Sequence, residues 1–441
     1  MRLGGRLAAA IEVLQDMEQR RRPVAEALKD WGLSHRFAGS GDRGAIGNIV
    51  YDALRRKFSA TWLTGDNSAR GQAFGALLLE WGLSPDAINK ELTGDRFAPE
   101  PLNAVELAGV QSRLREEMPD EMRADCPDWV VPHLQAAFGD AWVDEAAGLG
   151  ERPPLDLRVN TLLSDRETVL GELGETGAAP MRIASQGVRI APMRIASQGV
   201  RIAPIAGGGR HPNVQAEPAF QKGWFEIQDE GSQIAAELAG AKPGMQVLDY
   251  CAGGGGKTLA LAAIMKNEGR IVAHDSEKQR LAPIFDRLRR SEVRNVEVVA
   301  RAAELEPLVG SMDIVLIDAP CTGSGTWRRR PDAKWRLSQK QVEQRCREQA
   351  DILDKASRFV KPGGRLVYIT CSVFDAENRD QLAAFAARNK AFEIVDHVAL
   401  WSECFPRAVD LARVDATGGI RLSPKLSGTD GFYFAALTRV A

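Results

Sequence analysis

Apolar residues recur at every third or fourth position along the first part of the chain, which is the spacing of amphipathic helices. Ile11, Leu14 and Met17 follow this spacing, and so do the apolar residues between Ile46 and Leu54. Strand patterns are scarce before residue 125. The pattern therefore predicts an all-helical domain over residues 1–125.

The pattern changes between residues 126 and 235, where Pro and Gly are more frequent and apolar runs are short. Residues 156–160 alternate with the period of a strand. Residues 179–190 are repeated without change at 191–202, and each copy has the pattern of a hairpin around Ser-Gln-Gly. Two copies are too few for a solenoid. We therefore expect a small mixed α/β module that binds RNA and carries 179–202 as a tandem-duplicated surface insert.

Strand and helix patterns alternate from residue 236 to residue 441, which is typical of βαβ units and a mostly parallel sheet. The predicted strands are 246–250, 270–275, 312–317 and 365–369. Since a helix pattern begins near residue 259, directly after the first of them, the sequence predicts an α/β fold for this third domain.

Composition narrows the class of protein. The 441 residues are 44% hydrophobic and 26% charged, and 57 basic against 59 acidic side chains leave a formal charge of -2, so any nucleic-acid surface must be local. Six scattered cysteines argue against a disulfide scaffold and for a reducing compartment. No apolar run approaches the roughly 18 residues of a membrane span, and no signal peptide is apparent. We expect a cytoplasmic protein without a membrane partner.

Two cysteines follow directly after predicted buried strands. Cys321 stands in Asp-Ala-Pro-Cys after the strand 312–317, and Cys371 stands in Thr-Cys-Ser after the strand 365–369. A single cysteine of this kind is more often an inert core thiol. Ligands of open α/β sheets, however, bind beyond the carboxyl ends of the strands. The pair therefore suggests covalent chemistry.

A glycine-rich turn follows the strand 246–250. Residues 253–256 are all Gly and precede Lys257 and Thr258, but a phosphate-binding loop would need Gly where this chain has Cys251. Asp275 ends the next strand about twenty residues later, where a carboxylate accepts hydrogen bonds from ribose hydroxyls. Turn and acid together predict an adenosine-type ligand, and they do not separate NAD from S-adenosylmethionine.

Several motifs together resemble the RsmB/NSUN family of RNA cytosine-5 methyltransferases. They are Arg158 to Thr161, Gln228 to Ser232, the turn Asp249 to Thr258, Asp318 to Gly325, Arg330 to Trp335, Thr370 to Ser372 with Glu377 and Asn378, and Gly428 to Phe432. Residues 1–125 are similar to the NusB-like helical domain of bacterial RsmB proteins. The resemblance covers most of the chain and implies a Rossmann-like class I methyltransferase core.

The resemblance also implies a set of functional residues. S-adenosylmethionine is the expected methyl donor, and its binding residues are Cys251, Ala252, Gly253, Gly254, Gly255, Gly256, Lys257, Asp275, Arg280 and Asp318. Cys371 is the expected nucleophile, Cys321 the thiol that helps to release the product, and Asp318 the contact to the target base. The expected reaction forms 5-methylcytosine in ribosomal RNA, in the 16S molecule, through a covalent bond between cysteine and cytosine.

The sequence departs from the family pattern at two places. Gly253 and Gly254 stand where the family has Ala-Pro, which predicts a looser turn because glycine restricts the backbone less. The family's Asp after the third strand is replaced by the stretch Arg301 to Ala303, and Glu304 is the candidate to take over its contact.

A basic stretch with aromatic residues follows Cys321 and points to RNA. It combines Arg328, Arg330 and Lys334 with Trp335, and such a mixture binds phosphates and stacks on bases. Arg158 completes the predicted RNA contacts, and the target cytosine is expected in a single-stranded loop or flipped out. We expect no metal, because no Cys-x-x-Cys pair or partnering His is present, and we expect a monomer.

Two other classes of function stay open at this point. A non-catalytic RNA-binding or ribosome-assembly factor would keep the basic stretch and tolerate loss of both thiols. A nicotinamide-dependent oxidoreductase would share the turn and Asp275 but has no use for paired thiols at strand ends. The same methylation on another RNA, such as tRNA, is a third alternative.

Overall fold

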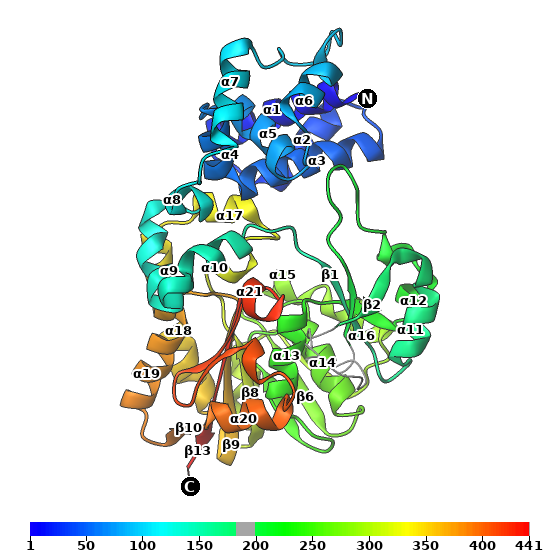
Figure 1. Ribbon diagram of the computed structural model, residues 1–441. Coiled ribbons are helices and arrows are strands. Elements are labelled where there is room, and N and C mark those ends of the chain that lie inside the picture. Colours follow the sequence, from blue (N-terminus) through cyan, green and yellow to red (C-terminus); the bar gives the residue numbers. More distant parts are fainter. Residues whose placement is uncertain (182–198, 441) are drawn as a thin grey trace. The chain divides into compact units, whose positions relative to one another are not determined.

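The computed structural model describes residues 1–181 and 199–440 (Figure 1). These residues form two compact units. One unit contains Met1–Pro153, Pro204–His211 and Thr326–Leu337, and the other contains the remaining described residues. The duplicated insert is described only at its ends, since residues 182–198 lie outside the described part. The division into three domains at 125 and 235 stays a prediction.

The first unit is helical, as the sequence predicted. Its core is formed by apolar positions of the predicted helical spacing, among them Leu7, Leu14, Ile49 and Phe74, each at most 1% exposed. Its helices are α1 (Leu3–Arg20), α2 (Val24–Ser34), α3 (Ser40–Arg55), α4 (Lys57–Thr64), α5 (Ala69–Leu79), α6 (Pro85–Leu92), α7 (Ala104–Arg113), α8 (Asp120–Arg123), α9 (Val131–Phe138), α10 (Trp142–Gly148) and α17 (Pro331–Arg336).

Two segments distant in sequence belong to this helical unit. In the segment 204–211, the carbonyls of Gly207 and Gly209 accept hydrogen bonds from Asn48 Nδ2 of α3. In the segment 326–337, Trp335 Nε1 donates to the Leu54 carbonyl at 2.7 Å. The helical unit is therefore built from more of the chain than its first 125 residues.

The second unit begins with a small antiparallel sheet in the order β2-β3-β1-β4. Its strands enclose an apolar cluster that includes Leu157, Val200 and Phe225, all fully buried. This agrees with the mixed α/β pattern of the sequence. The elements are β1 (Leu155–Val159), α11 (Arg166–Glu172), β2 (Ala178–Pro180), β3 (Gly199–Ile202), α12 (Pro218–Gln221) and β4 (Phe225–Ile227).

A nine-stranded sheet dominates the second unit, in the order β11-β12-β13-β9-β8-β5-β6-β7, with β10 paired to β13. The strands β7, β6, β5, β8 and β9 run parallel, and all four strands predicted from residue 236 onward are present. They are β5 (Gln246–Asp249), β6 (Arg270–His274), β7 (Val296–Val299), β8 (Met312–Asp318), β9 (Val360–Thr370), β10 (Phe392–Ile394), β11 (Arg413–Asp415), β12 (Gly419–Leu422) and β13 (Phe432–Arg439).

Alternating residues of the parallel strands fill two apolar layers, one on each face of the sheet. Leu316 faces a layer shared with α13, α14 and α20, and Ile317 faces a layer shared with α18 and α19 (Figure 1). Burial on both faces explains the continuous apolar runs in the sequence. The helices are α13 (Glu230–Leu238), α14 (Gly256–Ile264), α15 (Lys278–Leu281), α16 (Ile284–Arg290), α18 (Gln339–Ser357), α19 (Arg379–Arg388), α20 (His397–Cys404) and α21 (Pro424–Ser427).

The strand order reverses between β5 and β8. The chain runs outward from β5 to β6 and β7, and then returns to place β8 on the other side of β5. Ligand sites of open α/β sheets form at such a switch point, beyond the carboxyl ends of the strands. Among the described residues, no helix combines the length and apolar character needed to cross a membrane.

We expect Leu316→Ala to lower the free energy of unfolding by about 2–5 kcal/mol, because it leaves a cavity in a fully buried layer. Val309→Ala is the control, since Val309 is 47% exposed in the same unit, and it should change stability by less than about 0.5 kcal/mol. Chemical denaturation measures both. Equal effects of the two substitutions would contradict the described packing.

Candidate active site

The glycine-rich turn after β5 has the backbone shape that its sequence suggests. Gly253 (φ 49°) and Gly255 (φ 81°) lie in the left-handed region, which side chains disfavour. A Cβ atom on Gly255 would also lie 2.4 Å from Cγ1 of Ile284. Position 255 therefore requires glycine, and the backbone of the turn is left bare for a ligand.

Side chains from the neighbouring elements restrain this turn. The Gly253 N–H donates to Asp275 Oδ2 at 3.0 Å, and Arg287 Nη1 of α16 donates to the Gly254 carbonyl at 2.5 Å. The sequence predicted a loose turn because of its extra glycines. These two hydrogen bonds offset part of that freedom, and such contacts could not be inferred from the turn alone.

Asp275 and Arg280 lie beside the turn, as expected for cofactor-binding residues. The Asp275 side chain is 2% exposed, and its Oδ1 accepts from the Glu277 N–H at 3.0 Å. Arg280 Nη1 lies 3.6 Å from Asp275 Oδ2. The end of β6 thus presents a fixed carboxylate with a cation next to it.

Asp249, the last residue of β5, was not among the predicted site residues. Its Oδ2 accepts from Thr258 Oγ1 at 2.7 Å, and its Oδ1 has no hydrogen-bond partner among the described residues. Burial raises the pKa of Asp249 to about 7, while the Thr258 hydrogen bond opposes the shift. Its position between a buried strand and the turn was the available signal.

The thiol of Cys251 is unsuited to act as a nucleophile. Burial, and next the charge of Asp249, raise the pKa of Cys251 well above its ordinary value. Only the thiolate form of cysteine is strongly nucleophilic. Cys251 is therefore compatible with its predicted place in the binding turn, and it is unsuited to a covalent role.

Lys257 and Asp318 form an ion pair at the switch point. Nζ of Lys257, in the first turn of α14, lies 2.7 Å from Oδ2 of Asp318 at the end of β8. The Lys257 side chain is 6% exposed and that of Asp318 is 37% exposed. Lys257 thus holds the carboxylate from the buried side, and the other side stays open to a ligand.

Cys321 and Cys371 meet at the same edge of the sheet. The strands β8 and β9 are parallel with Asp318 opposite Ile369, so both loops leave the sheet together. The two Sγ atoms are 3.4 Å apart, and both side chains are half-buried. The structure brings together the thiols that the sequence paired, and their separate roles stay predictions.

The two thiols share a hydrogen bond in which either sulfur can be the donor. This hydrogen bond and, next, burial raise the pKa of Cys321 well above its ordinary value. Cys321 is therefore a neutral thiol at neutral pH.

The candidate to replace the missing Asp after β7 has another partner. Glu304, the candidate substitute, forms an ion pair with Arg301 at the surface. This pairing ties the Glu304 carboxylate to its own loop, so its predicted contact to the cofactor finds no support in the geometry.

The predicted RNA contacts near Cys321 belong to the helical unit, and two of them are buried there. Lys334 is 1% exposed and Arg328 is 3% exposed. Burial lowers the pKa of Lys334 to about 8, although the Asp125 charge opposes the shift. Trp335 packs on Phe58 with ring centroids 4.9 Å apart. Arg330 is exposed, and its contact with RNA stays a prediction.

Arg158 is also buried, within the second unit. It is 7% exposed, and its Nε donates to Gln228 Oε1 at 2.6 Å. Burial lowers the pKa of Arg158 to about 10. In this structure Arg158 connects β1 to the segment before α13. Its guanidinium group is therefore not exposed for the expected contact with RNA phosphates.

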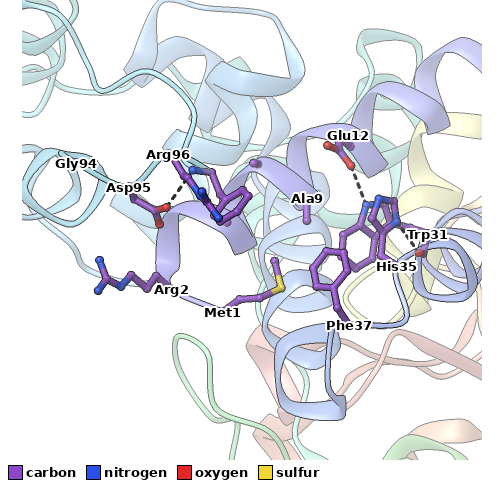
Figure 2. A pocket seen from close by; sticks show the side chains of 13 residues that line it. Met1, Arg2, Ala9, Glu12, Trp31, His35, Phe37, Gly94, Asp95 and Arg96 are labelled. Atoms are coloured by element: carbon purple, nitrogen blue, oxygen red, sulfur yellow. Dashed lines mark hydrogen bonds between the residues drawn. The ribbon is translucent and has the colours of Figure 1, made fainter.

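The helical unit contains a hollow of about 790 Å³, shown in Figure 2. Its lining includes Trp31 and His35, whose rings stack with centroids 4.3 Å apart. Its two carboxylates are engaged, since Trp31 Nε1 donates to Glu12 and the Phe97 N–H donates to Asp95. Its described lining contains no cysteine. The hollow therefore offers no thiol for the predicted covalent chemistry.

Comparison with known proteins agrees with this geometry. A model of the 16S rRNA methyltransferase RsmB/F family matches residues 237–438, and one of the ferredoxin-like domain of RsmF/B-like methyltransferases matches 126–196. The ribosomal RNA small subunit methyltransferase B of Klebsiella pneumoniae is 30% identical over 333 residues, which cover 75% of this chain and 69% of that relative. The chain belongs to the RsmB/F family.

Further similarities extend over much of the chain. The methyltransferase B of Salmonella newport is 33% identical over 282 residues, which span 63% of this chain and 61% of that protein. The crystal structure of PH0851 matches 99% of this chain and all of its own, with 25% identity and a TM-score of 0.68. A methyltransferase homolog from Pyrococcus horikoshii matches 73% of this chain and 98% of its own, with 26% identity and a TM-score of 0.57. The predicted Rossmann-like methyltransferase fold is confirmed.

In the part of the chain that the structure describes, no group of three or more His, Cys, Asp or Glu side chains gathers in a way that could hold a metal ion. Two further cysteines differ in exposure: Cys126 is buried in the helical unit, and Cys404 is exposed on α20.

Asp249→Asn should remove a pH-dependent loss in the free energy of unfolding. The folded protein binds the Asp249 proton more tightly than the unfolded chain, because the folded pKa is about 7 and the unfolded one about 3.9. The free energy of unfolding of the wild type should therefore fall between about pH 4 and pH 7. Asn does not titrate, so its stability relative to the wild type should rise over this range by a few kcal/mol, measured by urea denaturation.

Asp313→Asn is a control of opposite sign. The pKa of Asp313 is lowered: burial raises it, but hydrogen bonds from the Gln246 N–H and Lys361 outweigh that effect. Its ionised form stabilises the fold, and this stabilisation is complete above the unfolded pKa of about 3.9. Below about pH 4, the Asp313→Asn variant should therefore lose stability relative to the wild type as pH rises. Parallel pH profiles of Asp249→Asn and the wild type would contradict the burial of an unpaired Asp249 oxygen.

Proposed function

We propose that this protein methylates carbon 5 of cytosine in 16S ribosomal RNA, with S-adenosylmethionine as the methyl donor. The observation that carries the proposal is the pair of thiols, Cys321 and Cys371, 3.4 Å apart. They lie at the same edge of the parallel sheet as the ion pair of Lys257 and Asp318. Membership of the RsmB/F family supports methyl transfer to ribosomal RNA.

The residues at the switch point fit S-adenosylmethionine. The left-handed turn 253–255 offers bare backbone, and Asp275 at the end of β6 is in the position that binds ribose hydroxyls in such sheets. Arg280 beside Asp275 and the open side of Asp318 complete the set. When bound, S-adenosylmethionine supplies an electrophilic methyl group.

Carbon 5 of cytosine is a poor nucleophile and needs activation. The Cys371 thiolate adds to carbon 6, which shifts electron density to carbon 5, and this covalent step divides a difficult reaction into easier ones. Negative charge then builds toward ring nitrogen 3. Only a protonated Asp318 can donate to that nitrogen, and the Lys257 ammonium, 2.7 Å from Asp318 Oδ2, can supply the proton. The proton then neutralises the charge on nitrogen 3.

Release of the product reverses the covalent bond. After methylation, water takes the proton from carbon 5, the double bond to carbon 6 forms again, and the bond to the Cys371 sulfur breaks. The departing sulfur carries negative charge. The Cys321 sulfur lies 3.4 Å from that of Cys371, close enough for its thiol to donate a hydrogen bond to the departing thiolate, which supports its role in release.

Cys371→Ala should abolish turnover, because no other group in this mechanism can form the bond to carbon 6. The measurement is transfer of labelled methyl groups from S-adenosylmethionine to unmethylated 16S ribosomal RNA, with 5-methylcytosine identified after digestion. Cys404→Ala is the matched control, since this exposed cysteine lies on α20 outside the site, and it should retain wild-type turnover. Wild-type protein that yields labelled 5-methylcytosine in tRNA alone would identify another substrate.

Cys321→Ala should instead trap the covalent intermediate, because the leaving thiolate loses its hydrogen-bond donor. A protein–RNA adduct stable to denaturing electrophoresis should accumulate, and the double variant that also lacks Cys371 should form none. Unimpaired turnover of Cys321→Ala would exclude the release role. RNA binding without methylation by the wild type, or tighter binding of NAD than of S-adenosylmethionine, would favour the other classes of function.

A further inference from the structure

A buried carboxylate lies beneath the two cysteine loops. Glu377 ends the short helical turn Asp375–Glu377 and is 0% exposed. Its Oε1 accepts from the Thr322 N–H at 2.8 Å and from Gln349 Nε2 at 3.0 Å. Its Oε2 accepts from the hydroxyls of Thr322 and Ser372. The carboxylate is thus surrounded by hydrogen-bond donors, and no ion pair of Glu377 is present in the described residues.

The donors are the residues next to the thiols. Thr322 follows Cys321, and Ser372 follows Cys371. Gln349 of α18 also donates to the carbonyl of Pro320, the residue before Cys321, at 3.0 Å. One carboxylate therefore connects both loops, within one residue of each sulfur-bearing position.

The backbone at Glu377 is itself held in place. Tyr368 of β9 donates its hydroxyl to the Glu377 carbonyl, and Asn378 is bound by Thr370 and by the carbonyl of Ser372. A buried charge is costly unless hydrogen bonds compensate it, and such fully satisfied networks fix a single geometry. The network has little freedom to move either loop alone.

We propose that Glu377 is the positioning residue of the thiol pair: its carboxylate joins Thr322 to Ser372 and so sets the separation of the Cys321 and Cys371 sulfurs. The consequence for methyl transfer rests on the function proposed above, whereas the effect on the thiols does not. A neutral amide replaces the carboxylate poorly. With its oxygen on the Thr322 N–H and Gln349, a Gln side chain turns its NH2 to the two hydroxyls, which must then reverse their hydrogen bonds, and the charge-assisted hydrogen bonds of the carboxylate are lost.

Thiol labelling tests the positioning without RNA. In Glu377→Gln, the loops lose their common acceptor and Cys321 loses a nearby negative charge, so both thiols should be more accessible and Cys321 more readily ionised. Alkylation of Cys321 and Cys371 by iodoacetamide, followed by mass spectrometry of their peptides, should become several-fold faster. Asp375→Asn is the matched control, since Asp375 lies in the same turn and pairs with Arg421, and it should label like the wild type.

Turnover tests the catalytic consequence. Misplacement of reacting groups by about 1 Å can cost about 10²-fold in rate, so kcat for 16S ribosomal RNA should fall by about that factor in Glu377→Gln. The KM for RNA and the affinity for S-adenosylmethionine should not change. Among the described residues, the Glu377 carboxylate bonds to Thr322, Gln349 and Ser372, and not to the glycine-rich turn or Asp318. A loss caused by unfolding would instead appear in the donor affinity as well.

Thr322→Val and Ser372→Ala keep the test decisive if Glu377→Gln does not fold. Each removes one hydroxyl donor and leaves the carboxylate, and each should speed labelling of the thiol beside it and lower kcat. Unchanged labelling in all three variants, or lowered kcat with unchanged labelling, would overturn the proposal. If the variants are labelled faster but the wild-type protein makes no 5-methylcytosine, the proposed function is refuted and the positioning role of Glu377 stands.

Discussion

The reversal of strand order between β5 and β8 is the constraint on which the site depends. It brings the end of β5, with its glycine turn, next to the end of β8, with Asp318. The parallel pairing of β8 with β9 then adds the loop of Cys371 to the same edge. Residues more than a hundred positions apart in sequence meet there because parallel strands end at a common edge of the sheet.

The polar groups at this edge are held mainly by side chains that lie next to them in space. Lys257 neutralises Asp318 from the buried side, and Glu377 fixes the residues that follow both thiols. Asp249 is the exception, because one of its oxygens is buried without a described partner. A raised pKa is the physical result, since burial favours the neutral carboxyl. The free energy of unfolding at neutral pH is thus lowered by a residue that directly precedes the glycine-rich turn.

The helical unit shows what composition alone leaves undecided. Arg328, Lys334 and Trp335 have the composition of an RNA-binding stretch, yet their contacts are with α3 and its surroundings. Lys334 lies near the buried Asp125, and Trp335 caps the end of α3 by donating to the Leu54 carbonyl. Cations with long aliphatic stems serve packing as well as charge, and only burial distinguishes the two uses.

The sequence by itself determined the helical front, the parallel strands, the glycine turn and the pairing of Cys321 with Cys371. These follow from local periodicity, from backbone needs at glycine, and from the rule that parallel strands end together. Only the tertiary structure decided which basic residues are exposed, that one oxygen of Asp249 is buried without a partner among the described residues, and that Glu377 joins both thiol loops. Those properties depend on contacts between distant segments, such as Thr322 with Glu377, and no local pattern in the chain encodes them.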